Sequence, residues 1–262
     1  MTTPATILTT ETNGEVRTIT LRRLKFLNAF DSALALEFQA ALRTASKDDA
    51  IRVIVVTGSG GAFSAGQDIF ELADAEQSGG AAAVGRQLRE RLCPLIVDIR
   101  AIEKPVIARI NGVAAGAGLA VALACDFRVA SSSASLVMSP IGIGLIPGVG
   151  LSMLVPRLAG VGAATELFML GARISATESQ EFGLVHQVVP GDQLHAAVAD
   201  LARRLIEQPR EVLGLTKRAL NRSVYAGLEE HLDYECALQE LAAGTAEHRM
   251  RLARQMRGKA PS

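Results

Sequence analysis

Aromatic residues are scarce in this sequence, which has no tryptophan, two tyrosines and eight phenylalanines among 262 residues. Single-stranded nucleic acids are commonly held on aromatic side chains that stack with the bases, so this scarcity argues against such a platform. The sequence also has no charge excess, because 27 lysines and arginines balance 27 aspartates and glutamates. No global field favours nucleic acid, anionic lipid or acidic substrates, and we expect no nucleic-acid partner and no membrane partner.

Cysteine and histidine are equally sparse. Cys93, Cys125 and Cys236 are odd in number, lie far apart and form no C-x-x-C pair. This pattern indicates neither a disulfide framework nor a zinc ribbon, and it fits a reducing, cytoplasmic setting. The four histidines show no H-E-x-x-H or other close ligand spacing. We therefore expect no metal site.

The sequence also lacks targeting and membrane signals. Its first residues have neither the basic start nor the apolar run of a secretory signal. Residues 129–156 carry no charge, which superficially suggests a membrane span, but Pro140, Pro147 and Pro156 would break a helix exposed to lipid. We interpret this segment as buried loop and short helix in a soluble protein.

Apolar periodicity predicts alternating strands and helices. Two runs in which apolar and polar residues alternate flank Asn13-Gly14, which is a strong signal for a β-hairpin. Residues 31–46 carry apolar residues at helical spacing, and Asp31 at their start suits a helix N-cap. A helical region interrupted at Gly79-Gly80 follows. Continuous apolar runs predict buried strands at 51–58, 105–110 and 126–131. This alternation favours an α/β class with much parallel pairing.

The composition shifts beyond residue 190. The sequence there is rich in charge and helix formers, and it predicts three or four amphipathic helices without intervening strands. A chain of this length can bury one large core with an extension. We expect a core of residues 1–190 and a helical region of residues 191–262 that serves oligomerisation.

Three glycine-bearing segments could carry chemistry: residues 62–68, 111–126 and 141–150. Backbone N–H groups at a junction between a strand and a helix can cradle an oxyanion or a phosphate. Gly116-Ala117-Gly118 partly matches a dinucleotide-binding fingerprint, but no acidic residue follows about 20 residues later. Close helix packing and a nucleotide-dependent oxidoreductase are the two alternatives that this segment alone leaves open.

Five stretches occur in one order between about residues 5 and 225: LRRLKFLNAFD, VIVVTGSGGAFSAGQDI, KPVIARINGVAAGAGLAVALACDFRVAS, IGIGLIPGVG and FMLGARISATESQEFGLVHQVV. Together they resemble the crotonase, or enoyl-CoA hydratase/isomerase, superfamily. The GQD, GVAAGAG and GLIP motifs and the proline of LCPL resemble its phenylacetate-type ring-opening isomerases. The resemblance implies a spiral of ββα units with a C-terminal helical trimerisation region. It also implies a homotrimer or dimer of trimers, with an acyl-CoA thioester as substrate and no further cofactor.

The resemblance also implies a site. It places an oxyanion hole at the backbone N–H groups of Gln67 and Ala117, which would stabilise the enolate oxygen of the thioester. It places the CoA and acyl contacts at Lys25, Leu27, Ala29, Ala65, Asp68, Ile69, Gly116, Met138 and Ile141. Lys25 could instead be a solvated loop residue, and Asp68 is better explained as a helix N-cap than as a chemical group.

The usual catalytic carboxylates of the family are missing. The resemblance aligns the two glutamates of hydratases with Ala120 and Pro140, and the aspartate of the isomerases with Gly148. None of these residues can move a proton. The loop of residues 138–151 is therefore free of acids.

Three other residues are candidates for acid, base or polar roles. Ser139 lies beside the second vacant position, but a serine without a base is a poor proton acceptor. Glu71 and Glu90 lie on the helical segment that resembles the roof of the acyl pocket, although exposed helix charges are the simpler interpretation of both. Two hypotheses follow: an enzyme whose substrate brings an easily lost group or that uses an unplaced acid, or a non-catalytic protein that binds acyl-CoA.

Overall fold

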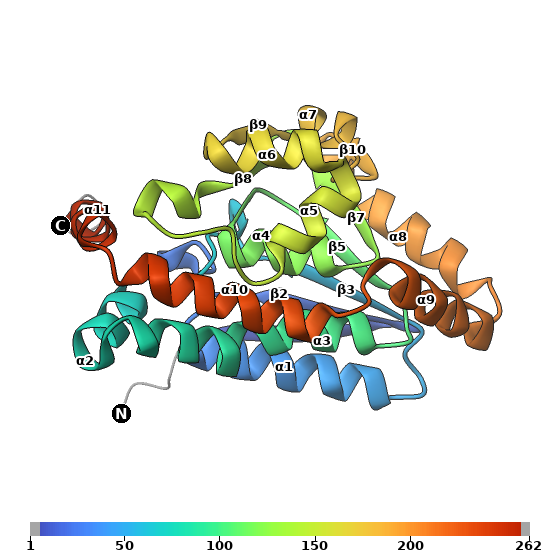
Figure 1. Ribbon diagram of the computed structural model, residues 1–262. Coiled ribbons are helices and arrows are strands. Elements are labelled where there is room, and N and C mark those ends of the chain that lie inside the picture. The colour runs from blue at the N-terminus through green and yellow to red at the C-terminus, as the bar shows by residue number, and fades with distance from the viewer. Residues whose placement is uncertain (1–5, 258–262) are drawn as a thin grey trace, which may run out of the picture.

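The computed structural model describes residues 6–257, apart from the side chain of Ser139, and contains two β-sheets surrounded by helices (Figure 1). In the described residues the larger sheet has the spatial order β1 (Leu8–Asn13), β2 (Val16–Leu21), β3 (Val53–Gly58), β5 (Val106–Ile110), β7 (Phe127–Ser131) and β10 (Gln187–Val189). The smaller sheet has the order β4 (Ala62–Ser64), β6 (Val113–Ala115), β8 (Ser135–Val137) and β9 (Arg173–Ser175). Pairing is parallel except between β1 and β2 and between β8 and β9.

Successive strands alternate between the two sheets. β3, β5 and β7 belong to the larger sheet, and the strand that follows each of them, β4, β6 or β8, belongs to the smaller one. Helical segments separate these pairs of strands. After β8 the order changes, because β9 joins the smaller sheet and β10, which follows α7, joins the larger one. The chain therefore forms the predicted spiral of ββα units. In each of these units the first strand belongs to the larger sheet and the second strand belongs to the smaller sheet.

The helices of the core cover the two sheets. They are α1 (Ser32–Lys47), α2 (Ile69–Gln87), α3 (Cys93–Ala101), α4 (Gly116–Ala124), α5 (Leu151–Ala159), α6 (Val161–Met169) and α7 (Ala176–Glu181). The shorter helical segments are η1 (Leu24–Phe26), η2 (Leu88–Leu92), η3 (Ser139–Ile143) and η4 (Gly191–Gln193). Gly80, with φ 64° and ψ −162°, breaks α2, so the predicted interruption at Gly79-Gly80 is confirmed.

Four described helices follow the core, as predicted. They are α8 (Leu194–Ile206), α9 (Arg210–Val224), α10 (Leu228–Ala243) and α11 (Ala246–Arg257). α8 packs on the larger sheet, whereas α10 lies along α2 of its own chain (Figure 1). The C-terminal helices thus pack against the core of their own chain. Their role in oligomerisation is a separate prediction.

The larger sheet is buried on both faces. In β3, Ile54 and Val56 contribute to the main core, whereas Val53 and Val55 pack with the apolar face of α8. Alternate residues of a strand point to opposite faces, so a strand covered on both faces needs apolar residues at every position. This explains why the continuous apolar run 51–58 forms a strand. No helix of the described residues is long and apolar enough to cross a membrane.

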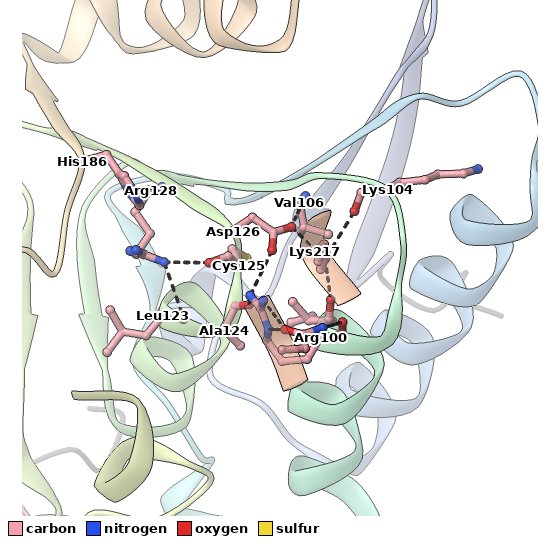
Figure 2. A network of polar contacts seen from close by, with 12 residues as sticks. Arg100, Lys104, Val106, Leu123, Ala124, Cys125, Asp126, Arg128, His186 and Lys217 are labelled. Carbon is pink, nitrogen blue, oxygen red and sulfur yellow. Dashed lines mark hydrogen bonds and ion pairs between the residues drawn. The ribbon is translucent and has the colours of Figure 1, made fainter. Parts of the chain in front are cut away.

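A buried polar network holds the spiral to the C-terminal helices (Figure 2). Asp126, immediately before β7, accepts hydrogen bonds from Arg100 Nη1 at 3.0 Å, Lys217 Nζ at 2.7 Å and Val106 N–H at 2.9 Å. Burial lowers the pKa of Lys217, while the Asp126 carboxylate opposes this effect. The network joins α3, α9 and the start of β5, which gives Asp126 a structural role.

Candidate active site

A cavity of about 550 Å³ opens where β4 and β6 end and α2 and α4 begin. Its wall brings together eleven residues singled out in the sequence: Lys25, Leu27, Ala29, Ala65, Gln67, Asp68, Ile69, Gly116, Ala117, Pro140 and Gly148. The remaining described wall is largely apolar, with Leu72, Leu145, Ile146 and Leu151 among its members. Such a cavity suits an acyl chain better than a charged ligand.

Two peptide segments meet at this cavity. β4 and β6 are neighbouring parallel strands, with Ser64 paired to Ala114, so the segments that follow them emerge side by side. A Cβ placed on Gly66, where φ is +95°, would lie 2.7 Å from Ala115 O and 3.3 Å from Ala117 N. Only glycine permits this approach. It brings the peptide groups of Gln67 and Ala117 to one wall of the cavity.

The N–H groups of Gln67 and Ala117 make no hydrogen bond to any other described residue. For Ala117 the reason is its place in the first turn of α4, where N–H groups have no partner within the helix. Ala115, the N-cap, offers no side-chain acceptor. The positive end of the α4 dipole and an unsatisfied donor therefore lie at the cavity wall, an arrangement suited to a developing negative oxygen.

Close packing fixes the beginning of α4. A Cβ on Gly118 would lie 2.5 Å from Cβ and Oγ of Ser64. Ser64 is itself fully buried, and its Oγ donates to Asn28 O at 2.8 Å. Gly118 of the GAG motif thus serves close packing, and this packing fixes the turn that carries the Ala117 N–H. Gly116 instead has open space around it and a φ of +46°, so its glycine suits the backbone conformation rather than the packing.

Asp68 is the only carboxylate among the described residues of the cavity wall. Its Oδ1 accepts from the Phe70 N–H at 2.9 Å, which makes it the predicted N-cap of α2. Its Oδ2 accepts from Arg23 Nη2 at 2.9 Å, and Arg23 also pairs with Asp31. Both carboxylate oxygens are engaged in structural contacts, so Asp68 is poorly placed to act as a base.

One edge of the cavity is formed by η1. Lys25 is exposed there, and the ring of Phe26, 44% exposed, lies under the guanidinium of Arg23 at 4.5 Å. An exposed ammonium beside apolar side chains suits a ligand with a charged end and an apolar end. Lys25 therefore lies at the rim of the cavity, where its ammonium group is exposed to solvent and accessible to a phosphate group of a ligand.

α10 contributes residues that sequence reasoning did not identify. Gln239 lines the cavity, and its Oε1 accepts from the Ile146 N–H at 3.0 Å. One turn earlier, the buried Glu235 accepts from Gly150 N–H at 2.6 Å and from Ser152 N–H at 3.1 Å. Together these two side chains hold the wall segment of residues 146–152 in place.

This wall segment has an unusual backbone. Val149, a β-branched residue that lines the cavity, has φ +58°, and the next residue, Gly150, has φ +87°. A left-handed conformation is costly for valine and persists only where surrounding contacts impose it. The Glu235 carboxylate supplies such a contact.

The structure places several predicted site residues away from the cavity. Met138 is fully buried in the main core, and Ile141 is 41% exposed, so neither contributes to the cavity wall. Met138 immediately precedes η3 and Ile141 lies within it, and residue type alone does not reveal which way a side chain points at such a turn. Ala120 is buried within α4. The side chain of Ser139 lies outside the described part of the structure.

The two glutamate candidates on the predicted roof also lie elsewhere. Glu71 Oε2 accepts from the Ser32 N–H at 2.9 Å and so caps the first turn of α1. Glu90 is exposed on η2. Neither lines the cavity. Neither is therefore placed to fill the candidate acid or base role considered from the sequence, where helix charges are the simpler interpretation of both.

Comparison with known proteins identifies the family. A family model described as enoyl-CoA hydratase/isomerase matches residues 11–257. The chain belongs to this family. It is 38% identical over 234 residues to the 1,2-epoxyphenylacetyl-CoA isomerase of Escherichia coli strain K12, covering 89% of each protein. It is 32% identical over 228 residues to the short-chain-enoyl-CoA hydratase of Clostridium acetobutylicum, covering 86% of this chain and 85% of that one.

Solved structures of enoyl-CoA hydratases share the fold. An enoyl-CoA hydratase from Mycobacterium avium subsp. paratuberculosis superposes with a TM-score of 0.82 at 27% identity, covering 99% of each chain. An enoyl-CoA hydratase from Bacillus halodurans superposes with a TM-score of 0.89 at 23% identity, covering 95% of this chain and all of the other. The enoyl-CoA hydratase/isomerase fold therefore extends over nearly the whole chain.

Proposed function

We propose that this family member binds an acyl-CoA thioester in the cavity and stabilises the enolate oxygen with the backbone N–H groups of Gln67 and Ala117. The observation that carries the proposal is the pair of unsatisfied N–H groups on one apolar wall. An enolate formed beside a thioester places negative charge on the carbonyl oxygen. Two preorganised donors in a cavity of low dielectric stabilise that charge without reorganising during the reaction.

The acyl chain occupies the apolar wall, and the CoA portion leaves past η1, where the exposed Lys25 meets a phosphate. The proton-transfer step cannot rest on Asp68, whose oxygens are both engaged. The proposed reactions are therefore those in which the substrate supplies an easily lost group or rearranges around its enolate. Isomerisation of an activated acyl group, the reaction type of the Escherichia coli relative, belongs to this class.

A second candidate is a non-catalytic protein that binds acyl-CoA, since the described wall offers no free carboxylate. The family match argues against the third possibility, a nucleotide-dependent oxidoreductase. Calorimetric titration with an acyl-CoA and with NAD separates binding of these two ligand classes. Turnover across crotonyl-CoA, a 3-enoyl-CoA and a malonyl-type thioester then separates an enzyme from a binding protein.

Vibrational spectroscopy tests the oxyanion hole without requiring turnover. A thioester labelled with ¹³C at the carbonyl should show its C=O stretch at lower frequency when bound than in water, because two hydrogen bonds polarise the carbonyl. An unshifted band in a saturated complex would refute the assignment of Gln67 and Ala117. Brisk hydration of crotonyl-CoA would refute the claim that the missing glutamates matter.

A further inference from the structure

Gln239 combines deep burial with a free hydrogen-bonding group. The residue is 5% exposed and lies on the cavity wall. Its Oε1 accepts from the Ile146 N–H at 3.0 Å. An N–H can pair only with the oxygen of the amide, so this contact sets the orientation of the side chain.

The nitrogen end of the amide faces the cavity. A Cβ on Gly148, which lines the cavity, would lie 3.6 Å from Gln239 Nε2. Within residues 6–257, Nε2 donates to no acceptor. Its neighbours on the wall, Leu145, Ile146 and Leu151, offer apolar side chains. An amide nitrogen carries two donor hydrogens, and both are available to a ligand.

This free donor is not needed to support the wall. The Glu235 carboxylate already holds Gly150 and Ser152, and Oε1 of Gln239 alone holds Ile146. Nε2 is not among the buried side-chain atoms of the described residues that lack a partner, so it reaches the open space of the cavity. A ligand acceptor could take the place of water there, whereas an alkyl chain would exclude water and leave this donor unpaired.

We propose that Gln239 is a specificity-determining residue whose Nε2 donates to an oxygen on the acyl chain, so that the site prefers oxygen-bearing acyl groups to plain alkyl groups. The inference rests on the proposed function, since it assumes that the acyl portion of a CoA thioester fills the cavity. The oxygen is an acceptor, such as a ketone, an ether or an epoxide, separate from the thioester carbonyl.

The test compares octanoyl-CoA with its 4-, 5-, 6- and 7-oxo derivatives by calorimetry at pH 8. Each ketone adds an acceptor and no donor, and the series scans the acceptor along the cavity. We expect at least one oxo chain to bind about tenfold more tightly than octanoyl-CoA, because one net hydrogen bond is worth about that much. Gln239→Met should abolish this preference, so that octanoyl-CoA and the best oxo chain bind with equal affinity, whether or not loss of the Ile146 contact changes both affinities.

Gln239→Glu separates the donor from the support of the wall. At pH 8 its carboxylate keeps an acceptor for the Ile146 N–H but offers no donor to the ligand. It should therefore lose the preference for the oxo chain while keeping the acceptor for the Ile146 N–H. Loss of preference in both variants supports the proposal.

Two results overturn the inference. Equal binding of octanoyl-CoA and every oxo chain by the original protein would show that Nε2 selects nothing, while leaving acyl-CoA binding intact. A preference that persists in Gln239→Met would assign it to another residue. If no acyl-CoA binds at all, the proposed function fails, and the specificity assigned to Gln239 fails with it.

Discussion

Lys217 Nζ lies 2.7 Å from Asp126 Oδ2, which joins α9 to the start of β7 across 91 residues of sequence. Both side chains are largely buried, and Arg100 approaches the other oxygen of the same carboxylate at 3.0 Å. One acid thus balances two buried cations. It links α9 of the C-terminal helices to α3 and to the start of β7.

Asp126→Asn should therefore destabilise the protein strongly. The substitution leaves Lys217 and Arg100 facing a neutral amide, and removing one partner of a buried ion pair typically costs about 3–5 kcal/mol. The free energy of unfolding, measured by urea denaturation, should fall by about that amount. Asp200→Asn is the matched control, because it breaks an exposed pair with Arg203, and it should leave the urea midpoint unchanged. Equal effects of the two substitutions would contradict the structural role of Asp126.

Ala117→Pro should impair catalysis through the backbone. Proline removes the N–H, while its ring is tolerated in the first turn of a helix. Loss of one oxyanion donor typically lowers kcat by about 10² to 10³. The downward shift of the thioester C=O stretch should diminish in the same variant.

The control for this substitution is Ala117→Gly, which changes the side chain but keeps the N–H. It should lose far less activity and retain the spectral shift. If both variants lost activity equally, the side chain rather than the peptide group of Ala117 would be the important feature.

Glu235→Gln tests how the cavity wall is held. The carboxylate accepts from Gly150 N–H, Ser152 N–H and the Ser152 hydroxyl. An amide accepts more weakly and brings two donor hydrogens toward those donors, so the wall should open more readily. Hydrogen exchange at Gly150 and Ser152 should become faster, and acyl-CoA affinity should fall. Glu229→Gln at the start of the same helix should change neither measurement.

The stability of the protein should decrease as the pH falls from about 6.5 toward 4, partly because of His186. Although the residue as a whole is exposed, its ring packs against Phe127, and its Nδ1 accepts from the Arg128 N–H at 3.2 Å. Desolvation of the ring, followed by repulsion from Arg128, lowers the pKa of His186 to about 4. The unfolded chain, with a histidine pKa of about 6.5, binds this proton first, and protonation therefore favours unfolding.

Urea midpoints at pH 7 and pH 5 should reveal this effect. His186→Asn keeps an acceptor for the Arg128 N–H but cannot take up a proton in this range, so it should lose less stability between the two pH values. An NMR titration in which His186 protonates near pH 6.5 would contradict the prediction.

Short-range patterns predicted most of the fold. Three features depend on the backbone preferences of a few neighbouring residues, which can be predicted from residue type: the hairpin at Asn13-Gly14, the Asp31 cap of α1 and the break at Gly79-Gly80. The burial of β3 on both faces could likewise be predicted from its continuous apolar run. These features need no knowledge of distant partners.

Long-range partners of the site could not be predicted in this way. Gln239 meets Ile146 across 93 residues, and the helical periodicity of α10 shows only that one face is buried, without naming what covers it. The sequence favoured an oligomerisation role for this region and gave no sign that α10 also lines the cavity. Met138 and Ile141 were expected to line the cavity, but the turn into η3 buries Met138 in the main core and leaves Ile141 41% exposed, which residue type does not reveal.

The two proposed donors belong to successive turns of the same spiral. Their separation follows from the spacing of β4 and β6, about 4.8 Å between neighbouring strands, and from glycines that let the segments touch. The one side chain that contributes is the buried Ser64, which packs against Gly118 and accepts from the Gly66 N–H. Substitutions in the rest of the cavity wall, including α10, can therefore change which acyl groups fit. The two proposed N–H donors would keep their positions, because the backbone sets them.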